Sequence, residues 1–329
     1  MRREVSHVDR IRSVIDDDAA PAASAVAASW RRCVTLHGLD PEARRAPDLI
    51  DAAALHAARE RLAPLLRAAQ NPLDRLFVAV AELGCCTLLS NVEGVPLERR
   101  SAEADAADFD ARGLRPGAVW SEAREGTNAI GACLAEGRAL TIHRDQHFHT
   151  RNTGLSCAAA PIYDHEGRLA AALDVSCSRE TLPGGMVALV AIAVAEAARA
   201  IEAAHFREAF AGARIVTAPS ERGAALLAVD RHDLVIGATR AARLELGVTD
   251  ARIAAQLPAA DLLTGGGEAQ AELHKAELQI AELKDAERGA IRRALARANG
   301  NVTAAARLLG VSRATLHRKL GRLGLSQGH

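Results

Sequence analysis

The chain has 329 residues, and its 41 basic and 41 acidic side chains give a formal net charge of zero. Only 2% of the residues are aromatic, which disfavours a stacking platform for single-stranded nucleic acid, and ~100–200 residues per domain predict two or three domains. The charged N-terminus has no apolar signal segment, and the longest apolar run, Met186 to Ala195, is well short of the ~20 residues that span a bilayer, so we expect a cytoplasmic protein with no membrane partner.

The first 70 residues predict an N-terminal helical extension. Amphipathic stretches at Ser24–Leu36 and Leu49–Ala69 are separated by Gly38 and Pro41. Pro64 should kink the second helix or end its first half, because proline lacks an N–H group and clashes with the preceding turn. We expect this extension, residues 1–70, to dock on the domain that follows.

Residues 71–206 change to an α+β pattern. The expected elements are a helix at Leu73–Leu83, strands at Cys85–Ser90, Leu140–His143, Leu155–Tyr163 and Leu169–Cys177, and a long helix from Pro183 to about Phe210. The last strand alternates, with Leu173, Val175 and Cys177 on one face and Asp174 and Ser176 on the other. Asp164–Gly167 predicts a hairpin turn before this strand.

Four motifs in this region carry a resemblance. They are Ser121-Glu-Ala-Arg-Glu-Gly-Thr-Asn-Ala-Ile-Gly131, His147-Phe148, Gly154–Ile162 and Leu173-Asp-Val-Ser176. Together they resemble the GAF sensor domain of acetoin-catabolism-type regulators. The resemblance implies an antiparallel sheet flanked by helices, with a small-molecule pocket on one side of the sheet, and therefore a small-molecule effector as a partner.

The same resemblance implies the pocket residues. At positions that match its motifs, the ligand-binding candidates are Trp120, Asn128, His147, Cys157 and Asp174. Each has a structural alternative. Trp120 could pack in the core, and Asp174 could be a solvated or capping carboxylate at a strand end.

The six cysteines include no Cys-x-x-Cys pair, so buried reduced thiols are the expectation. His143, His147 and His149 lie near Cys133, Cys157 and Cys177 in the sequence, but the spacing matches no known ligand set. We therefore expect no metal and no cofactor. A redox- or metal-responsive regulator stays as an alternative, although no charge flanks Cys157 that would lower its thiol pKa.

Residues 207–262 predict a short connector. Ala224–Asp230, Arg231–Asp233, Leu234–Gly237 and Ala238–Leu246 suggest strand, turn, strand and helix. This order resembles the opening of a PAS domain, truncated here. Residues 263–283 predict a linker and short amphipathic helix, with a flexible Thr264–Glu268 joint and a heptad-like stripe at Leu273, Ala276, Ile280 and Leu283.

Residues 284–329 predict an all-α helix-turn-helix. Apolar positions at Ala305, Ala306 and Leu309, the turn at Gly310, and Leu316, Leu320 and Leu323 give two crossing helices. Thr303 and Ser312 are the expected N-caps of these helices. From Lys284 to His329 there are ten basic and two acidic residues, which favours double-stranded DNA as the partner, with a solvated basic hairpin as the alternative.

The segment from about Glu287 to Leu325 resembles the Fis-type helix-turn-helix that ends many bacterial enhancer-binding regulators. The resemblance implies that Arg313 reads a base and that Ser312, Thr315, Arg318 and Lys319 contact bases or phosphates. His317 stands where a more basic residue is common, and it and Thr303 complete the DNA-binding candidates. Since one such motif reads only a half-site, we expect a homodimer.

Regulators with these two end domains usually carry an AAA+ ATPase between them. A P-loop needs Gly-Lys, but the three lysines follow His274, Leu283 and Arg318. We therefore expect no enzyme and no catalytic residues, and a regulator that acts by binding DNA, alone or with a full-length sigma-54-dependent activator. The alternatives are an architectural DNA-binding protein and a redox enzyme, for which no base paired with a nucleophile is evident.

Overall fold

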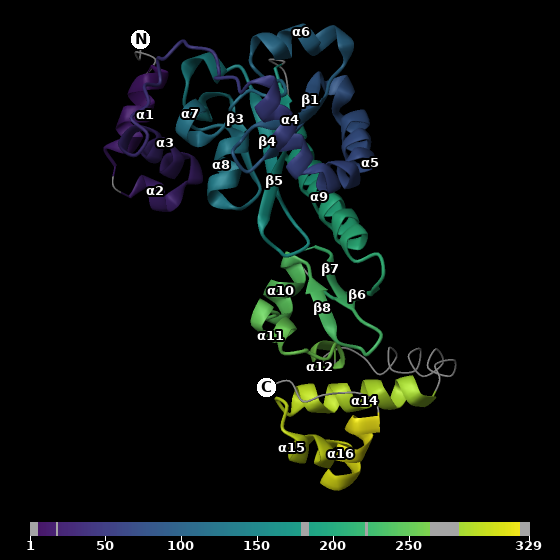
Figure 1. Ribbon diagram of the computed structural model, residues 1–329. Helices are drawn as coiled ribbons and strands as arrows, with labels where there is room; N and C mark the ends of the chain where they lie inside the picture. The colour runs from purple at the N-terminus through teal and green to yellow at the C-terminus, as the bar shows by residue number, and fades with distance from the viewer. Residues whose placement is uncertain (1–5, 18, 179–183, 221–222, 264–282, 323–329) are drawn as a thin grey trace. The chain divides into compact units, whose positions relative to one another are not determined.

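The computed structural model describes all residues except 1–5, 18, 179–183, 221–222, 264–282 and 323–329 (Figure 1). Contacts divide the chain into two units, residues 1–164 with 168–205 and residues 165–167 with 206–329. Among the helices that the structure describes, none combines the length and the hydropathy of a transmembrane span.

The first unit begins with helices. They are α1 (His7–Ile15), α2 (Ala20–Ala23), α3 (Ala25–Thr35), α4 (Ala52–Arg61) and α5 (Ala63–Val80). Ser24 caps α3, and Pro64 lies in the first turn of α5, which confirms the predicted break. The separate helix expected from Leu73 is wrong, because the buried stripe of α5 runs on through it. The expected boundary at residues 70–71 thus falls inside α5.

A five-stranded antiparallel sheet forms the centre of this unit. Its strands are β1 (Cys85–Asn91), β2 (Pro96–Arg100), β3 (Leu140–His143), β4 (Ser156–Tyr163) and β5 (Leu169–Cys177), in the order β2-β1-β5-β4-β3. The four predicted strands are confirmed, and so is the fold class. Strand β2 was not predicted, because it begins with a proline and ends in Glu-Arg-Arg, as an edge strand can.

The two faces of the sheet pack against different helices (Figure 1). On one face, Leu173, Val175 and Cys177 of β5 join a core with α5 and α9 (Gly184–Ala209). The other face is covered by Trp120, by α8 (Ala129–Glu136) and by Phe109 of α6 (Glu103–Ala111). A short helix, α7 (Glu122–Glu125), precedes α8. The adjacent Cys85 and Cys86 fall in different cores, as strand alternation predicts.

The second unit contains a smaller antiparallel sheet in the order β6-β7-β8, from β6 (Arg214–Ala218), β7 (Ala225–Val229) and β8 (Val235–Ala238). Helices α10 (Arg240–Leu246), α11 (Asp250–Ala254) and α12 (Ala260–Leu263) follow. The predicted strand, turn, strand and helix are present. Strand β6 and the last two helices were not predicted.

Within residues 283–322, which the structure describes, three helices form the C-terminal part of this unit: α14 (Leu283–Arg297), α15 (Val302–Leu308) and α16 (Arg313–Arg322). Their core contains Ile291, Ala305, Ala306, Leu316 and Leu320, as the apolar spacing predicts. Gly310 has a φ of +65°, a left-handed conformation that favours glycine in the tight turn. Leu323 and the stripe of Leu273, Ala276 and Ile280 lie outside the described residues.

Candidate functional sites

Asp174 lies in the middle of β5, on the sheet face that α8 covers. It stands opposite Leu88 of β1 and Ala159 of β4, and both belong to the core on that face. The residue is only 1% exposed. Its Oδ2 lies 2.7 Å from the hydroxyl of Ser176, whereas Oδ1 is buried without a hydrogen-bond partner among the described residues.

A chain of polar contacts continues from this carboxyl group. Ser176 Oγ lies 3.1 Å from Cys157 Sγ, and Cys157 Sγ lies 3.5 Å from His147 Nε2. The other ring nitrogen of His147 lies 2.9 Å from the carbonyl oxygen of Arg144. We call Asp174, Ser176, Cys157 and His147 the buried polar chain. It brings three predicted ligand residues together through Ser176, which was not a candidate although alternation places it on the face of Asp174.

Burial sets the protonation of these groups. It raises the pKa of Asp174 to about 7 and lowers that of His147 to about 4, because a dry environment disfavours the charged form of either group. Burial and the nearby Asp174 carboxylate also raise the pKa of the Cys157 thiol well above its usual value. His147 and Cys157 are therefore neutral at physiological pH, while Asp174 titrates there.

The other two candidates bind backbone groups. Trp120 is buried and donates from Nε1 to the Gly113 carbonyl at 2.8 Å, and its ring packs in the same core as Cys157. Asn128 is the N-cap of α8: its Oδ1 accepts from Gly131 N at 2.9 Å, and its Nδ2 donates to the Gly126 carbonyl at 2.9 Å. These bonds favour a capping role for Asn128. The ring of Trp120 contributes an apolar surface to the core on this face of the sheet.

The motif at residues 121–131 also contacts the N-terminal extension, through residues that the sequence did not indicate. Glu122 is 6% exposed and accepts from Arg32 Nε at 2.6 Å, Arg32 Nη2 at 2.8 Å and Ser29 Oγ at 2.6 Å. Ser29 also lies 2.7 Å from the hydroxyl of Thr127. Both Arg32 and Ser29 belong to α3. The predicted docking of the extension on the GAF domain therefore takes place through buried and half-buried polar contacts.

Two further residues of this motif fix the neighbouring loop. Glu125 is fully buried and pairs with Arg151. Gly126 has a φ of +61°, and a Cβ atom there would lie 2.6 Å from the Phe148 side chain. Since only glycine fits this approach, the motif holds the loop that carries His147 and Phe148 against the sheet.

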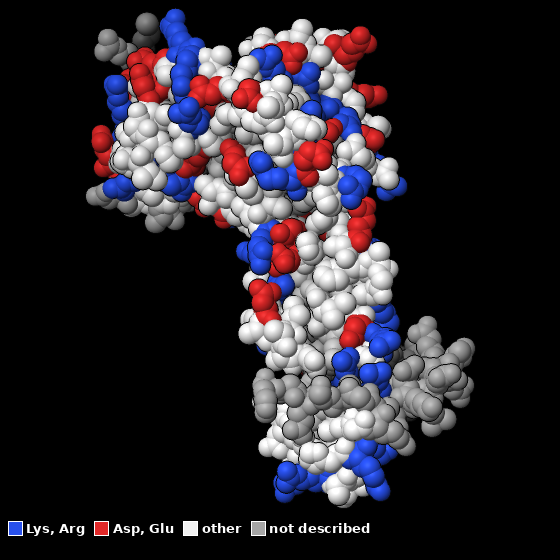
Figure 2. Space-filling model, in the orientation of Figure 1, with Lys and Arg blue, Asp and Glu red and all other residues white. Residues whose placement is uncertain are grey.

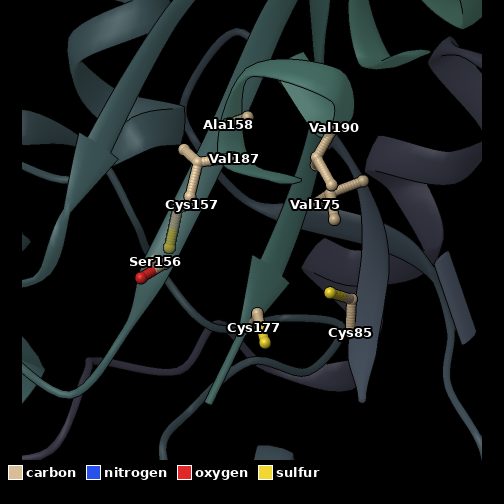
Figure 3. A pocket seen from close by; sticks show the side chains of 8 residues that line it. All are labelled: Cys85, Ser156, Cys157, Ala158, Val175, Cys177, Val187 and Val190. Atoms are coloured by element: carbon tan, nitrogen blue, oxygen red, sulfur yellow. The ribbon is translucent and has the colours of Figure 1, made fainter. Parts of the chain in front are cut away.

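A small cavity lies on the opposite face of the sheet (Figure 3). Its volume is about 10 Å³, and Cys85, Val175, Cys177 and Val190 are among its lining residues. A water molecule needs roughly 10–15 Å³ of such space. This cavity is too small for an organic effector. Its lining also includes Cys157 of the buried polar chain.

All six cysteines are buried and unbridged. Burial is the main cause that raises the thiol pKa of Cys33 to about 11 and keeps those of Cys86 and Cys133 far above their usual range. No group of three or more metal-ligating side chains occurs within the described residues. Such thiols behave as small apolar side chains.

The helix-turn-helix exposes most of its predicted DNA contacts. Thr303, Ser312, Arg313, His317 and Arg318 are exposed, and Thr315 and Lys319 are half-buried. Ser312 caps α16, since its hydroxyl accepts from Thr315 N at 3.1 Å. The expected cap at Thr303 is wrong. Helix α15 begins at Val302, so the cap is Asn301, whose Oδ1 accepts from the N–H groups of Thr303 and Ala304.

The charge of this region is uniformly positive. Residues 288–322 contain nine basic and no acidic side chains, and Figure 2 shows blue and white but no red on α15 and α16. Cations of this kind gain affinity for a phosphate backbone by releasing its counterions. Arg313 starts α16, the second helix of the motif, from which such domains read base edges in the major groove.

Comparison with known proteins identifies a family for the region that contains the five-stranded sheet and another for the C-terminal helices. Residues 53–201 match the family model of the GAF domain, and residues 282–323 match that of the Fis family of bacterial regulatory proteins. Among curated relatives, the acetoin catabolism regulatory protein of Cupriavidus necator is 42% identical over 149 residues, or 45% of this chain. The acetoin dehydrogenase operon transcriptional activator AcoR of Bacillus subtilis is 30% identical over 196 residues, or 58% of this chain.

These matches cover only 22% and 31% of the two relatives' own lengths. The crystal structure of the E. coli DhaR(N)-DhaL complex aligns with 78% of this chain and 85% of that chain, at a TM-score of 0.49 and 18% identity. The domain matches agree with the geometry of the antiparallel sheet and of the basic C-terminal helices. The chain therefore combines a GAF domain with a Fis-type helix-turn-helix and is related to acetoin catabolism regulators.

Proposed function

We propose that this protein is a sequence-specific transcription regulator, in which a small molecule bound by the GAF domain controls DNA binding by the helix-turn-helix. The observation that carries the proposal is the presence on one chain of a sensor domain with a buried polar chain and a uniformly basic Fis-type domain. A regulator of this kind works in the cytoplasm, where its DNA is.

The DNA-binding part of the proposal rests on α16. Arg313 and Arg318 are exposed on this helix, which Ser312 caps. A bidentate arginine–guanine contact is the commonest specific contact in the major groove. Thr303, Thr315, His317 and Lys319 are the remaining proposed contacts. Two half-sites one DNA turn apart would be read by a homodimer.

The sensing part rests on the sheet face around Asp174. The curated relatives are named for acetoin catabolism, so acetoin is the first effector to test here. His147, Cys157 and Asp174 supply the polar groups of the proposed site, while Trp120 supplies an apolar wall. Asn128 supports the site by capping α8.

The chain also lacks the Gly-Lys sequence of a P-loop. We propose that it does not hydrolyse ATP by that mechanism, and that it regulates by occupying DNA, as a simple repressor or activator. We propose a full-length sigma-54-dependent activator that binds the same site as a further partner, because both would carry a Fis-type domain.

DNA footprinting on fragments selected from the genomic DNA of the source organism tests the DNA claim. Arg313→Ala should weaken specific binding by about 1–3 kcal/mol, equivalent to roughly 5- to 150-fold. Arg138→Ala is the control, since Arg138 is an exposed arginine of the GAF domain. An unchanged footprint in Arg313→Ala would exclude the assigned reading position.

A further inference from the structure

The carboxyl group of Asp174 has an unused hydrogen-bond acceptor inside the sensor domain. Oδ2 lies beside Ser176 Oγ, but Oδ1 is buried and has no partner among the described residues. A buried acceptor left without a donor costs about 1–3 kcal/mol. Buried polar atoms without a partner are rare in folded proteins. A ligand that donates a hydrogen bond to Oδ1 would account for this one.

The hydrogens of the buried polar chain can be counted. There are four contacts: Asp174–Ser176, Ser176–Cys157, Cys157–His147 and His147 to the Arg144 carbonyl. The serine hydroxyl, the cysteine thiol and the neutral imidazole supply one hydrogen each. The hydroxyl of Ser176 is placed to donate either to Oδ2 of Asp174 or to Sγ of Cys157, but it has only one hydrogen. When that hydrogen goes to Cys157, the contact with Asp174 has a hydrogen only if Asp174 is protonated and Oδ2 donates to Ser176. In this arrangement Oδ1 is the carbonyl oxygen of a neutral acid.

The titratable neighbours of Asp174 support the neutral form. Cys86 on β1, Cys133 on α8 and Cys157 on β4 all sense the charge of Asp174, and burial raises the pKa of each thiol. His147, at the far end of the chain, stays uncharged because burial lowers its pKa to about 4. Burial raises the pKa of Asp174 itself to about 7, and this outweighs the hydrogen bond with Ser176, which favours the carboxylate. The buried polar chain thus supplies no positive charge that would stabilise a carboxylate.

The surroundings of Asp174 are otherwise apolar. Leu88 and Ala159 flank it on the neighbouring strands, and Trp120 and Ile130 belong to the core on this face. A ligand reaches the buried carboxyl only if side chains that pack over it move aside. Such a ligand must replace apolar contacts and cannot bring a charge without a large desolvation cost.

We infer that Asp174 is the specificity-determining residue of the sensor site and that its Oδ1 accepts a hydrogen bond from the hydroxyl group of a small, neutral and otherwise apolar effector. This inference rests on the proposed sensing function and narrows its ligand class to alcohols and hydroxy compounds. Ser176, Cys157 and His147 are positioning residues, because they hold the proton of Asp174 on the oxygen that faces away from the ligand.

The test compares three probes of one shape on the full chain: cyclohexanol, cyclohexanone and cyclohexylamine, with isopropanol and acetone as a smaller pair. Affinities are measured by ligand-observed NMR at a pH near 6. Asp174→Asn keeps a carbonyl oxygen and donates to Ser176 through its amide, as the neutral acid does. Asp174→Leu has nearly the same shape without an acceptor. Circular dichroism establishes that each variant is folded.

The alcohols should bind the wild type and Asp174→Asn at least tenfold more tightly than the ketones do, and Asp174→Leu should lose this preference. The protonated amine should bind no better than the ketone. Equal binding of ketones and alcohols to the wild type would overturn this inference and leave sensing intact, and a preference for the amine would do the same. Binding of none of the probes would count against both the inference and the proposed sensing function. If Asp174→Leu does not fold, the wild-type comparison decides alone.

Discussion

The guanidinium group of Arg32 binds both carboxylate oxygens of Glu122, with Nε 2.6 Å from Oε1 and Nη2 2.8 Å from Oε2. The two residues are 90 positions apart in the sequence. This pair joins the N-terminal extension to the motif that precedes α8. The extension therefore belongs to the same compact unit as the GAF domain.

Removal of this charge should loosen the extension. Glu122→Gln keeps the shape of the side chain but leaves Arg32 without its main counter-charge, so we expect a loss of about 2–4 kcal/mol in the free energy of unfolding. Glu136→Gln is the matched control. It removes the second, more exposed partner of Arg32 and should cost less than about 1 kcal/mol. Urea unfolding measures both, and equal losses would contradict the role assigned to Glu122.

The stability of the GAF domain should depend on pH through Asp174. Its pKa in the folded protein is about 7 against 3.8 for the free group, so the folded state holds a proton that the unfolded state has lost. The free energy of unfolding therefore falls by roughly 4 kcal/mol in total as the pH rises from about 4 to about 7. At higher pH it changes little. Asp174→Asn lacks this contribution.

The measurement is the difference in unfolding free energy between Asp174→Asn and the wild type at pH 4.5, 6 and 8. The variant should gain on the wild type as the pH rises. A difference that stays constant over this range would show that Asp174 is ionised throughout and would contradict the neutral acid.

The cysteines should be inert in the folded protein. All six are buried, and a thiol reacts as its thiolate, which burial disfavours. We expect no fast reaction with an aromatic disulfide reagent at neutral pH, and six reactive thiols after denaturation. Rapid labelling of Cys157 in the native state would instead favour the redox-responsive alternative.

The corrected helix cap gives a prediction about the DNA-binding domain. Asn301→Ala removes the acceptor for two N–H groups at the start of α15 and should destabilise the domain by about 1 kcal/mol. Thr303→Ala, two residues later, should leave the stability almost unchanged. Thermal unfolding of the two variants compares them directly. A larger loss of stability in Thr303→Ala than in Asn301→Ala would instead support Thr303 as the cap of α15.

Local patterns predicted much of this structure. The alternation of Leu173, Val175 and Cys177 against Asp174 and Ser176 predicted β5 and its faces, and the spacing of Leu316 and Leu320 predicted α16. Contacts between segments far apart in the sequence could not be predicted from such patterns. Nothing local in the sequence indicates that Glu122 meets Arg32.

The candidate site, too, was only partly predictable from the sequence. The motif resemblance selected His147, Cys157 and Asp174, but their connection through Ser176 depends on the register of β4 with β5, which pairs Cys157 with Ser176. The cap of α15 was misplaced by two residues for a related reason. Both Asn301 and Thr303 are good capping residues, and only the helix start decides between them.

The central claim is that a molecule bound beside Asp174 controls DNA binding by α16. The most direct measurement is the dissociation constant of the full chain for its selected DNA fragment, with and without saturating cyclohexanol, in the wild type and in Asp174→Leu. We expect cyclohexanol to change the wild-type affinity at least fivefold, and to leave that of Asp174→Leu unchanged. Equal affinities with and without cyclohexanol in the wild type, or the same change in both proteins, would contradict this account.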